Sequence, residues 1–240
     1  MAGVSRLQYT TEIRLIRVMC TGRIDLAHVM RAFTNGMDGV FIGGCHLNEC
    51  NYITQGNFHA LNLVMLAKRI MGYIGLDPNR LRMEFMSSGE GNLFAEVVDD
   101  FVREVREIGP LGQSEGLTKE QLQLNLKAVT KLVPYMRLVE SERLRGHFST
   151  QEEYEQFYSS AEFEKLFGEL IADKLAISQI MLLLQEKPLS TGEIAEILGL
   201  TPSEVSKHLN SSSKQGLVRY KEDEKRFALA VSEEAVSEVG

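Results

Sequence analysis

The chain has 240 residues, 44% of them hydrophobic, and a formal net charge of −7 at pH 7. This composition can bury a core, so a disordered chain is excluded as the default, and the length fits one or two domains. The sequence contains no apolar run of the roughly 18–20 residues that a membrane-spanning helix needs, and residues 1–12 lack the apolar stretch of a signal peptide. We therefore predict a soluble, cytoplasmic protein without a membrane span.

The first half of the chain alternates between short apolar stretches and longer amphipathic ones. Predicted strands cover residues 13–19, 39–43 and 81–86, and predicted helices cover about 26–33, 53–74 and 93–108. Strands that alternate with helices indicate a parallel sheet covered on both faces. We predict an α/β fold over residues 1–112, with a small parallel sheet of the flavodoxin or Rossmann type.

The second half has a different character. Residues 113–173 are polar with helical periodicity, and we predict a helical connector. Residues 174–230 contain two capping boxes, which start short helices, followed by two strand-like stretches. The capping boxes are Ser190–Glu193 and Thr201–Glu204, and the strands are 217–221 and 226–229. This order is typical of a winged helix-turn-helix domain, and residues 231–240 form an acidic tail.

Charge argues against a nucleic-acid partner. Residues 175–230 hold seven basic and seven acidic side chains, and the expected tip of the wing is Glu222-Asp223-Glu224. Proteins that bind DNA neutralise several phosphates with Lys and Arg, and acids at a wing tip would repel the backbone. We predict that the winged helix docks a protein rather than DNA.

Three cysteines are the strongest functional signal. Cys20 follows the first predicted strand, Cys45 follows the second, and Cys50 lies five residues further on. An odd count of three disfavours a disulfide framework. Loops at the C-terminal ends of parallel strands gather at one edge of the sheet, so we expect the three thiols to converge on one metal site. Buried free thiols are the alternative, and a structural zinc site lacks its usual C-x2–4-C pairs.

Four further residues are candidates for contacts to the metal group. Gly43 and Gly44 are expected to let the backbone approach closely and to adopt positive φ. Arg23 is the nearest cation in sequence to the cysteines, although an ion pair with Asp25 is an equal alternative. His46 is either a fourth ligand or, by preference, a neighbour of the ligands.

The cysteine segments resemble the delta (iron–sulfur) subunit family of methyl-viologen-reducing hydrogenase. The resemblance is carried by residues 14–24, 38–46, 50–52, 81–84 and 87–91. It implies a 2Fe–2S cluster with Cys20, Cys45 and Cys50 among its ligands. It also implies a domain that links a hydrogenase or a formate dehydrogenase to the flavin subunit of heterodisulfide reductase in methanogens and some anaerobic bacteria.

One departure from the family concerns the start of the chain. The family opens with a strand and a loop resembling C-x-x-C, just before the stretch that appears here as Ala2 to Tyr9. We therefore expect the fold to be truncated at its first strand, with the fourth cluster ligand upstream of Met1; the alternative is an incomplete cluster.

Three functional hypotheses follow. The first is an electron-transfer subunit of an oxidoreductase complex. This chain should itself turn over no substrate, because the sequence shows no nucleotide-binding glycine fingerprint and no catalytic acid–base pair. The alternatives are an iron–sulfur redox-sensing transcription regulator, and a zinc-stabilised scaffold.

Overall fold

The computed structural model describes residues 7–52, 55–146 and 148–230. They fall into two compact units, Met1–Phe167 and Gly168–Gly240. The predicted acidic tail and residues 2–6 of the family motif lie outside the described residues. None of the helices that the structure describes combines the length and the apolar content that crossing a bilayer requires.

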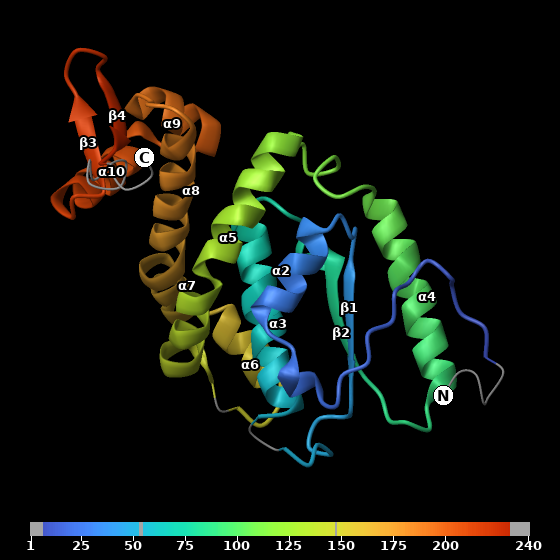
Figure 1. The fold of residues 1–240 in the computed structure, drawn as a ribbon. Helices are drawn as coiled ribbons and strands as arrows, with labels where there is room; N and C mark the ends of the chain where they lie inside the picture. Colours follow the sequence, from blue (N-terminus) through green and yellow to red (C-terminus); the bar gives the residue numbers. More distant parts are fainter. Residues whose placement is uncertain (1–6, 53–54, 147, 231–240) are drawn as a thin grey trace, which may run out of the picture. The chain divides into compact units, whose positions relative to one another are not determined.

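A two-stranded parallel sheet lies at the centre of the first unit. Strand β1 (Val40–Gly44) pairs with β2 (Leu81–Phe85), with Val40 opposite Leu81 and Gly44 opposite Phe85. Helices α2 (Leu26–Thr34) and α3 (Asn57–Tyr73) lie on one side of the sheet and α4 (Gly91–Ile108) on the other (Figure 1). The mixed α/β class and these two strands are confirmed, and a flavodoxin or Rossmann order stays a prediction.

The predicted first strand is wrong. Residues 13–18 have no regular secondary structure, and Ile16 and Met19 are 83% and 94% exposed. The residues before them are fixed to α4, because Tyr9 packs edge-on against Phe94 and the Thr10 amide donates to Asp99. β-Branched composition favours a strand only where a neighbouring strand supplies hydrogen bonds, and the described residues offer none to this segment.

Most of the predicted connector packs into the first unit. Helix α5 (Lys119–Val139) lies against α2 and buries an apolar stripe. It is followed by the π-helix η3 (Glu140–Leu144), α6 (Gln151–Tyr158) and α7 (Ala161–Phe167). The buried stripe of α5 consists of Leu126, Val129, Val133 and Met136. Burial of this stripe, about 1.5–3 kcal/mol for each large side chain, anchors the helix.

The second unit has the winged-helix arrangement. A π-helix, η4 (Gly168–Ala172), leads into α8 (Asp173–Glu186), α9 (Thr191–Leu198), α10 (Pro202–Lys214) and the antiparallel strands β3 (Val218–Lys221) and β4 (Arg226–Leu229). Both predicted capping boxes are present. Gly199 ends α9 in the left-handed conformation, which a residue without Cβ adopts at little cost.

Candidate metal centre

Two separate segments place the cysteines at one end of the sheet. Cys20 ends the exposed segment and precedes the 3-10 helix η1 (Thr21–Arg23), which contacts both β1 and α3. Cys45 comes directly after β1. Cys50 lies in the loop between β1 and α3. The two segments therefore meet where β1 ends and α3 begins.

The three thiols interact with one another. Burial alone would raise the pKa of Cys50, but N–H groups of Tyr52 and Asn57 and contacts from the thiols of Cys45 and Cys20 lower it below its ordinary value. Burial and the neighbouring Cys50 raise the pKa of Cys45. The thiolate is the form of cysteine that binds metal.

Asn57, the first residue of α3, holds the loop that carries Cys45. Its side-chain Nδ2 donates to the carbonyl oxygens of Cys45, at 3.0 Å, and His46, at 2.6 Å. The same nitrogen lies 3.6 Å from the Cys45 sulfur. Asn57 is fully buried, and its Oδ1 has no hydrogen-bond partner among the described residues.

Two glycines that the sequence analysis did not select leave no room for a side chain at the site. A Cβ on Gly56 would lie 2.2 Å from the Cys50 sulfur, and one on Gly22 would lie 1.9 Å from the carbonyl oxygen of Gln55. Gly43 and Gly44 instead belong to β1, and neither has the expected positive φ. That expectation was wrong because the strand extends through both residues before the loop begins.

His46 is bound by a carboxylate from the neighbouring loop. Its Nε2 lies 2.7 Å from Oε2 of Glu90, which also accepts the Ser87 amide. The Ser87 amide and the His46 contact lower the pKa of Glu90. The pair ties the loop after β1 to the loop after β2. Whether His46 is a ligand or a neighbour of the ligands stays a prediction.

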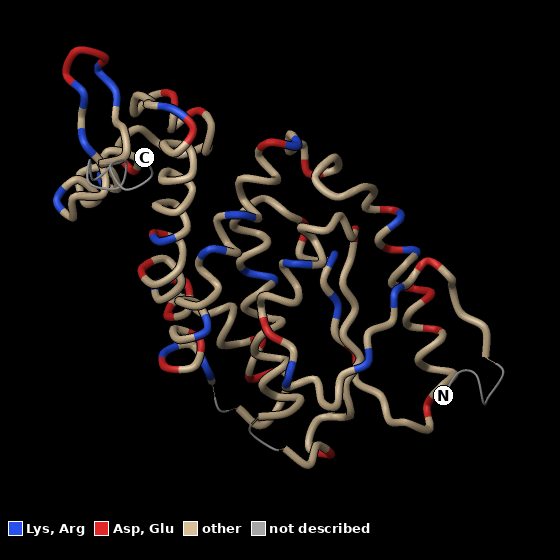
Figure 2. The backbone as a smooth tube through the Cα atoms, in the orientation of Figure 1, with Lys and Arg blue, Asp and Glu red and all other residues tan. Residues whose placement is uncertain are grey.

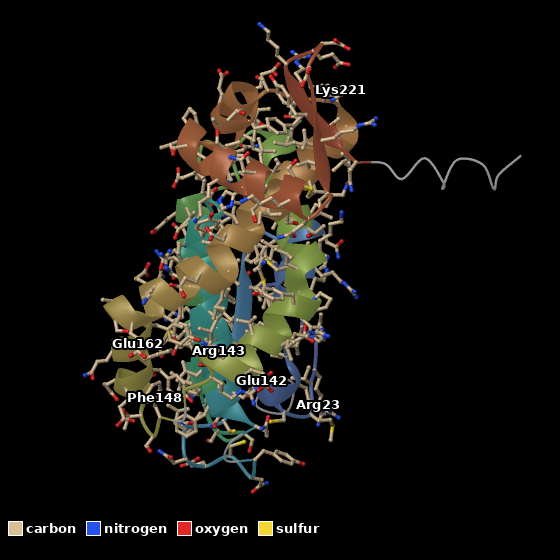
Figure 3. All side chains as sticks on the ribbon, turned by 90° about the vertical axis from the view of Figure 1, so that its left-hand side faces the viewer. Arg23, Glu142, Arg143, Phe148, Glu162 and Lys221 are labelled. Carbon is tan, nitrogen blue, oxygen red and sulfur yellow. The ribbon has the colours of Figure 1, made fainter. Side chains whose placement is uncertain are left out.

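Arg23 is exposed and makes no ion pair with any described residue. Asp25, its proposed partner, instead caps α2 and pairs with Arg137. Figure 3 shows Arg23 at the same end of the first unit as Glu142. Its charge is therefore available near the cysteines, three residues beyond Cys20.

Comparison with known proteins agrees with this geometry. Residues 1–109 match the family described as methyl-viologen-reducing hydrogenase, delta subunit. The iron–sulfur subunit of the F420-non-reducing hydrogenase of Archaeoglobus profundus is 41% identical over 110 residues, which cover 46% of this chain and 80% of that relative. The chain belongs to the methyl-viologen-reducing hydrogenase delta subunit family. The resemblance inferred from the cysteine segments is confirmed.

Other relatives place the delta-subunit region in a larger protein. One subunit of the ferredoxin:CoB-CoM heterodisulfide reductase of Methanosarcina mazei is 43% identical over 131 residues, which cover 55% of this chain. The chain spans 16% of that relative's length. Residues 178–220 match the family described as bacterial regulatory protein, arsR family, which agrees with the winged-helix arrangement of the second unit.

The delta-subunit residues fit an iron–sulfur group in part. Three interacting thiols, N–H donors directed at Cys50 and a glycine that a Cβ would force into its sulfur suit an anionic sulfur centre. Within the described ranges, no three side chains of His, Cys, Asp or Glu already have the arrangement of a metal site. The described residues therefore supply three candidate ligands, and the assignment of Cys20, Cys45 and Cys50 stays a prediction.

Asn57 and Glu90 are the residues that the sequence analysis missed. Each of them had a local signal. Gly56-Asn57 begins the α3 helical pattern directly after the cysteine loop, and Glu90 lies three residues after Ser87, the spacing of a capping box. The contact of Glu90 to the cysteine loop depends on the pairing of β1 with β2, which places the loops after the two strands side by side. Asn57 instead follows the cysteine loop directly in the chain.

Proposed function

We propose that residues 1–112 form an electron-transfer domain that binds a 2Fe–2S cluster, with Cys20, Cys45 and Cys50 as three of its four ligands. The supporting observation is that three thiols, from two separate segments, contact one another beside the N-terminal turn of α3. When bound, such a cluster accepts and releases one electron at a time. The chain's own residues hold the sulfurs in place and donate N–H groups to Cys50.

The proposed role in a complex is a relay. Electrons pass from a hydrogenase or a formate dehydrogenase, through this chain, to the flavin subunit of heterodisulfide reductase, in a cytoplasmic, anaerobic electron-bifurcating complex. The names of the relatives support this, since they include one subunit of a heterodisulfide reductase and the iron–sulfur subunit of a hydrogenase. The exposed position of Arg23 and the half-buried cysteines leave the site open to a partner. The chain alone is expected to oxidise neither hydrogen nor formate.

Reconstitution tests the cluster directly. The full chain, treated anaerobically with iron and sulfide and then desalted, is expected to retain equal amounts of both and to absorb visible light. Dithionite reduction should then produce the EPR signal of a one-electron-reduced 2Fe–2S cluster. Zinc retained without sulfide would replace this function with the zinc-stabilised scaffold. A chain that retains neither metal would refute both.

The second unit has a competing function, DNA binding, which the arsR-family match favours. We propose that it docks a partner subunit. Figure 2 shows acidic residues at the turn between β3 and β4, and these residues are exposed. Lys207 and Arg226 are already paired with Asp173 and Glu193. Lys214, Arg219 and Lys225 make no ion pair with a described residue, so the acids of the turn offset the cations that remain for phosphates.

Two binding measurements separate the alternatives. The full chain and a chain that ends at Phe167 are each mixed with the candidate hydrogenase, formate dehydrogenase and reductase subunits. Loss of one partner in the shortened chain supports docking. Specific duplex binding by the full chain, with affinity that falls steeply as salt rises, would instead establish the redox-sensing regulator.

A further inference from the structure

Asn57 contacts both loop cysteines from a single residue. Its side-chain amide reaches the Cys45 carbonyl and lies 3.6 Å from the Cys45 sulfur. Its backbone N–H donates to the Cys50 sulfur. No substitution at this position preserves all of these contacts unless it retains an amide nitrogen at the same distance from the backbone.

The other half of the same amide is left without a partner. Oδ1 of Asn57 is buried and accepts no hydrogen bond from the described residues. A buried acceptor without a partner is unfavourable, and at this position the cost is set against the hydrogen bonds of Nδ2 to the Cys45 and His46 carbonyl oxygens. The feature that an apolar residue could not supply is the N–H donor directed at the cysteine loop.

Asn62, five residues further along α3, is a buried asparagine with a structural role and serves as the comparison. It is also fully buried, but both halves of its amide are used. Its Nδ2 donates to Glu140 at 2.7 Å, and its Oδ1 accepts from the Tyr158 hydroxyl at 3.1 Å. Asn62 therefore completes a polar network, whereas Asn57 is only half satisfied and lies against sulfur.

We propose that Asn57 is a positioning residue of the iron–sulfur site. Its Nδ2 fixes the loop of Cys45 through the Cys45 and His46 carbonyl oxygens, and the same nitrogen lies 3.6 Å from the Cys45 sulfur. This inference rests on the proposed function. A one-electron reduction adds one negative charge to the cluster and its sulfurs without requiring a proton, and a nearby N–H donor stabilises that charge. Hydrogen bonds to cluster sulfurs raise the reduction potential in this way.

The test compares Asn57→Ala with Asn62→Ala in the reconstituted full chain. Asn57→Ala is expected to shift the midpoint potential, measured by EPR-monitored titration, to a more negative value and to retain less iron. Asn62→Ala is expected to lower the unfolding temperature while keeping the wild-type potential. Asn57→Ala with iron bound at the wild-type potential would overturn the proposal.

Two further variants separate loss of the N–H donor from misfolding. Asn57→Asp keeps the shape of the side chain but replaces the N–H donor with a carboxylate oxygen, so its potential should be lower still. Asn57→Gln, which keeps the amide, should recover part of the shift. Asn57→Ala, Asn57→Asp and Asn62→Ala are compared at equal unfolding temperatures. If the two Asn57 variants lose iron and Asn62→Ala keeps it, the positioning role is supported.

A measurement without iron separates this inference from the proposed function. In the metal-free chain, Cys45 is expected to react faster with iodoacetamide in Asn57→Ala than in the wild type or in Asn62→Ala, because its loop is no longer held. Equal rates in all three would refute the positioning role, whatever the iron content. If the wild type binds no iron, but Cys45 still reacts faster in metal-free Asn57→Ala than in the metal-free wild type, only the proposed function is refuted.

Discussion

The first two turns of α3 serve two different regions of the first unit. The first turn, with Asn57, contacts the cysteine loop, and the second, with Asn62, contacts the buried carboxylate of Glu140. Around Glu140, Arg145 donates to both carboxylate oxygens at 3.2 Å, and His59 lies 3.6 Å away. The comparison shows that one helix can serve two purposes. Asn62 stabilises the fold through a hydrogen-bond network in which nearly every polar group has a partner, and Asn57, one turn earlier, contacts the cysteine loop.

The largest expected effect belongs to the cysteine region. Cys50→Ser removes the thiol that Cys20, Cys45 and two backbone N–H groups contact, so essentially all iron should be lost after reconstitution. Far-UV circular dichroism should be unchanged, because Cys50 is only half-buried. Glu49→Ala, an exposed neighbour in the same loop, is the matched control and should keep its iron. Full iron content in Cys50→Ser would remove Cys50 from the site.

The second effect belongs to the carboxylate region. Glu140→Ala leaves the largely buried Arg145 without its anion and Asn62 without its acceptor. Removing one partner of a buried ion pair costs about 3–5 kcal/mol. Native-state hydrogen exchange of α3 peptides should show this loss, while Arg69→Ala, which breaks the half-exposed pair with Glu164, should cost under about 1 kcal/mol. Equal exchange in the two variants would contradict the assignment.

A glycine pair at the two ends of α3 sharpens the comparison further. Gly56→Ala places a Cβ against the Cys50 sulfur, so the loop must shift at a cost of about 1–3 kcal/mol and iron content should fall. A Cβ on Gly72, near the other end of α3, meets only Pro78 at 3.7 Å. Gly72→Ala should therefore stabilise the chain by roughly 0.5–1 kcal/mol and leave iron unchanged. Thermal unfolding and iron analysis of both variants check this.

The smallest effect is a pH dependence of the carboxylate region. Burial would raise the pKa of Glu140, but contacts with His59 and Arg145 lower it below the ordinary value of 4.5. A folded pKa below the unfolded one gives stability that is fully present above the unfolded pKa. That stability is lost as pH falls through the folded pKa. Denaturant unfolding at pH 7 and below pH 4.5 should show this loss in the wild type and less of it in Glu140→Gln.

Local sequence signals predicted the helices and the second unit well. The capping boxes at Ser190 and Thr201 begin α9 and α10 as predicted, because capping is decided within four residues. The same locality explains the failure at residues 13–19, since a strand depends on a distant partner that composition does not reveal. Val40–Gly44 has a comparable apolar pattern and is a strand because β2 pairs with it.

The sequence by itself determined the family, the three cysteines and most helix boundaries, because these depend on residue identity and short-range spacing. Only the tertiary structure decided which residues surround the sulfurs. Asn57 reaches Cys45 because the cysteine loop folds back onto the start of α3, and Glu90 reaches His46 because the parallel pairing of β1 and β2 brings their loops together. A hydrogen bond between residues 44 positions apart, as between His46 and Glu90, is set by sheet geometry rather than by any pattern along the chain.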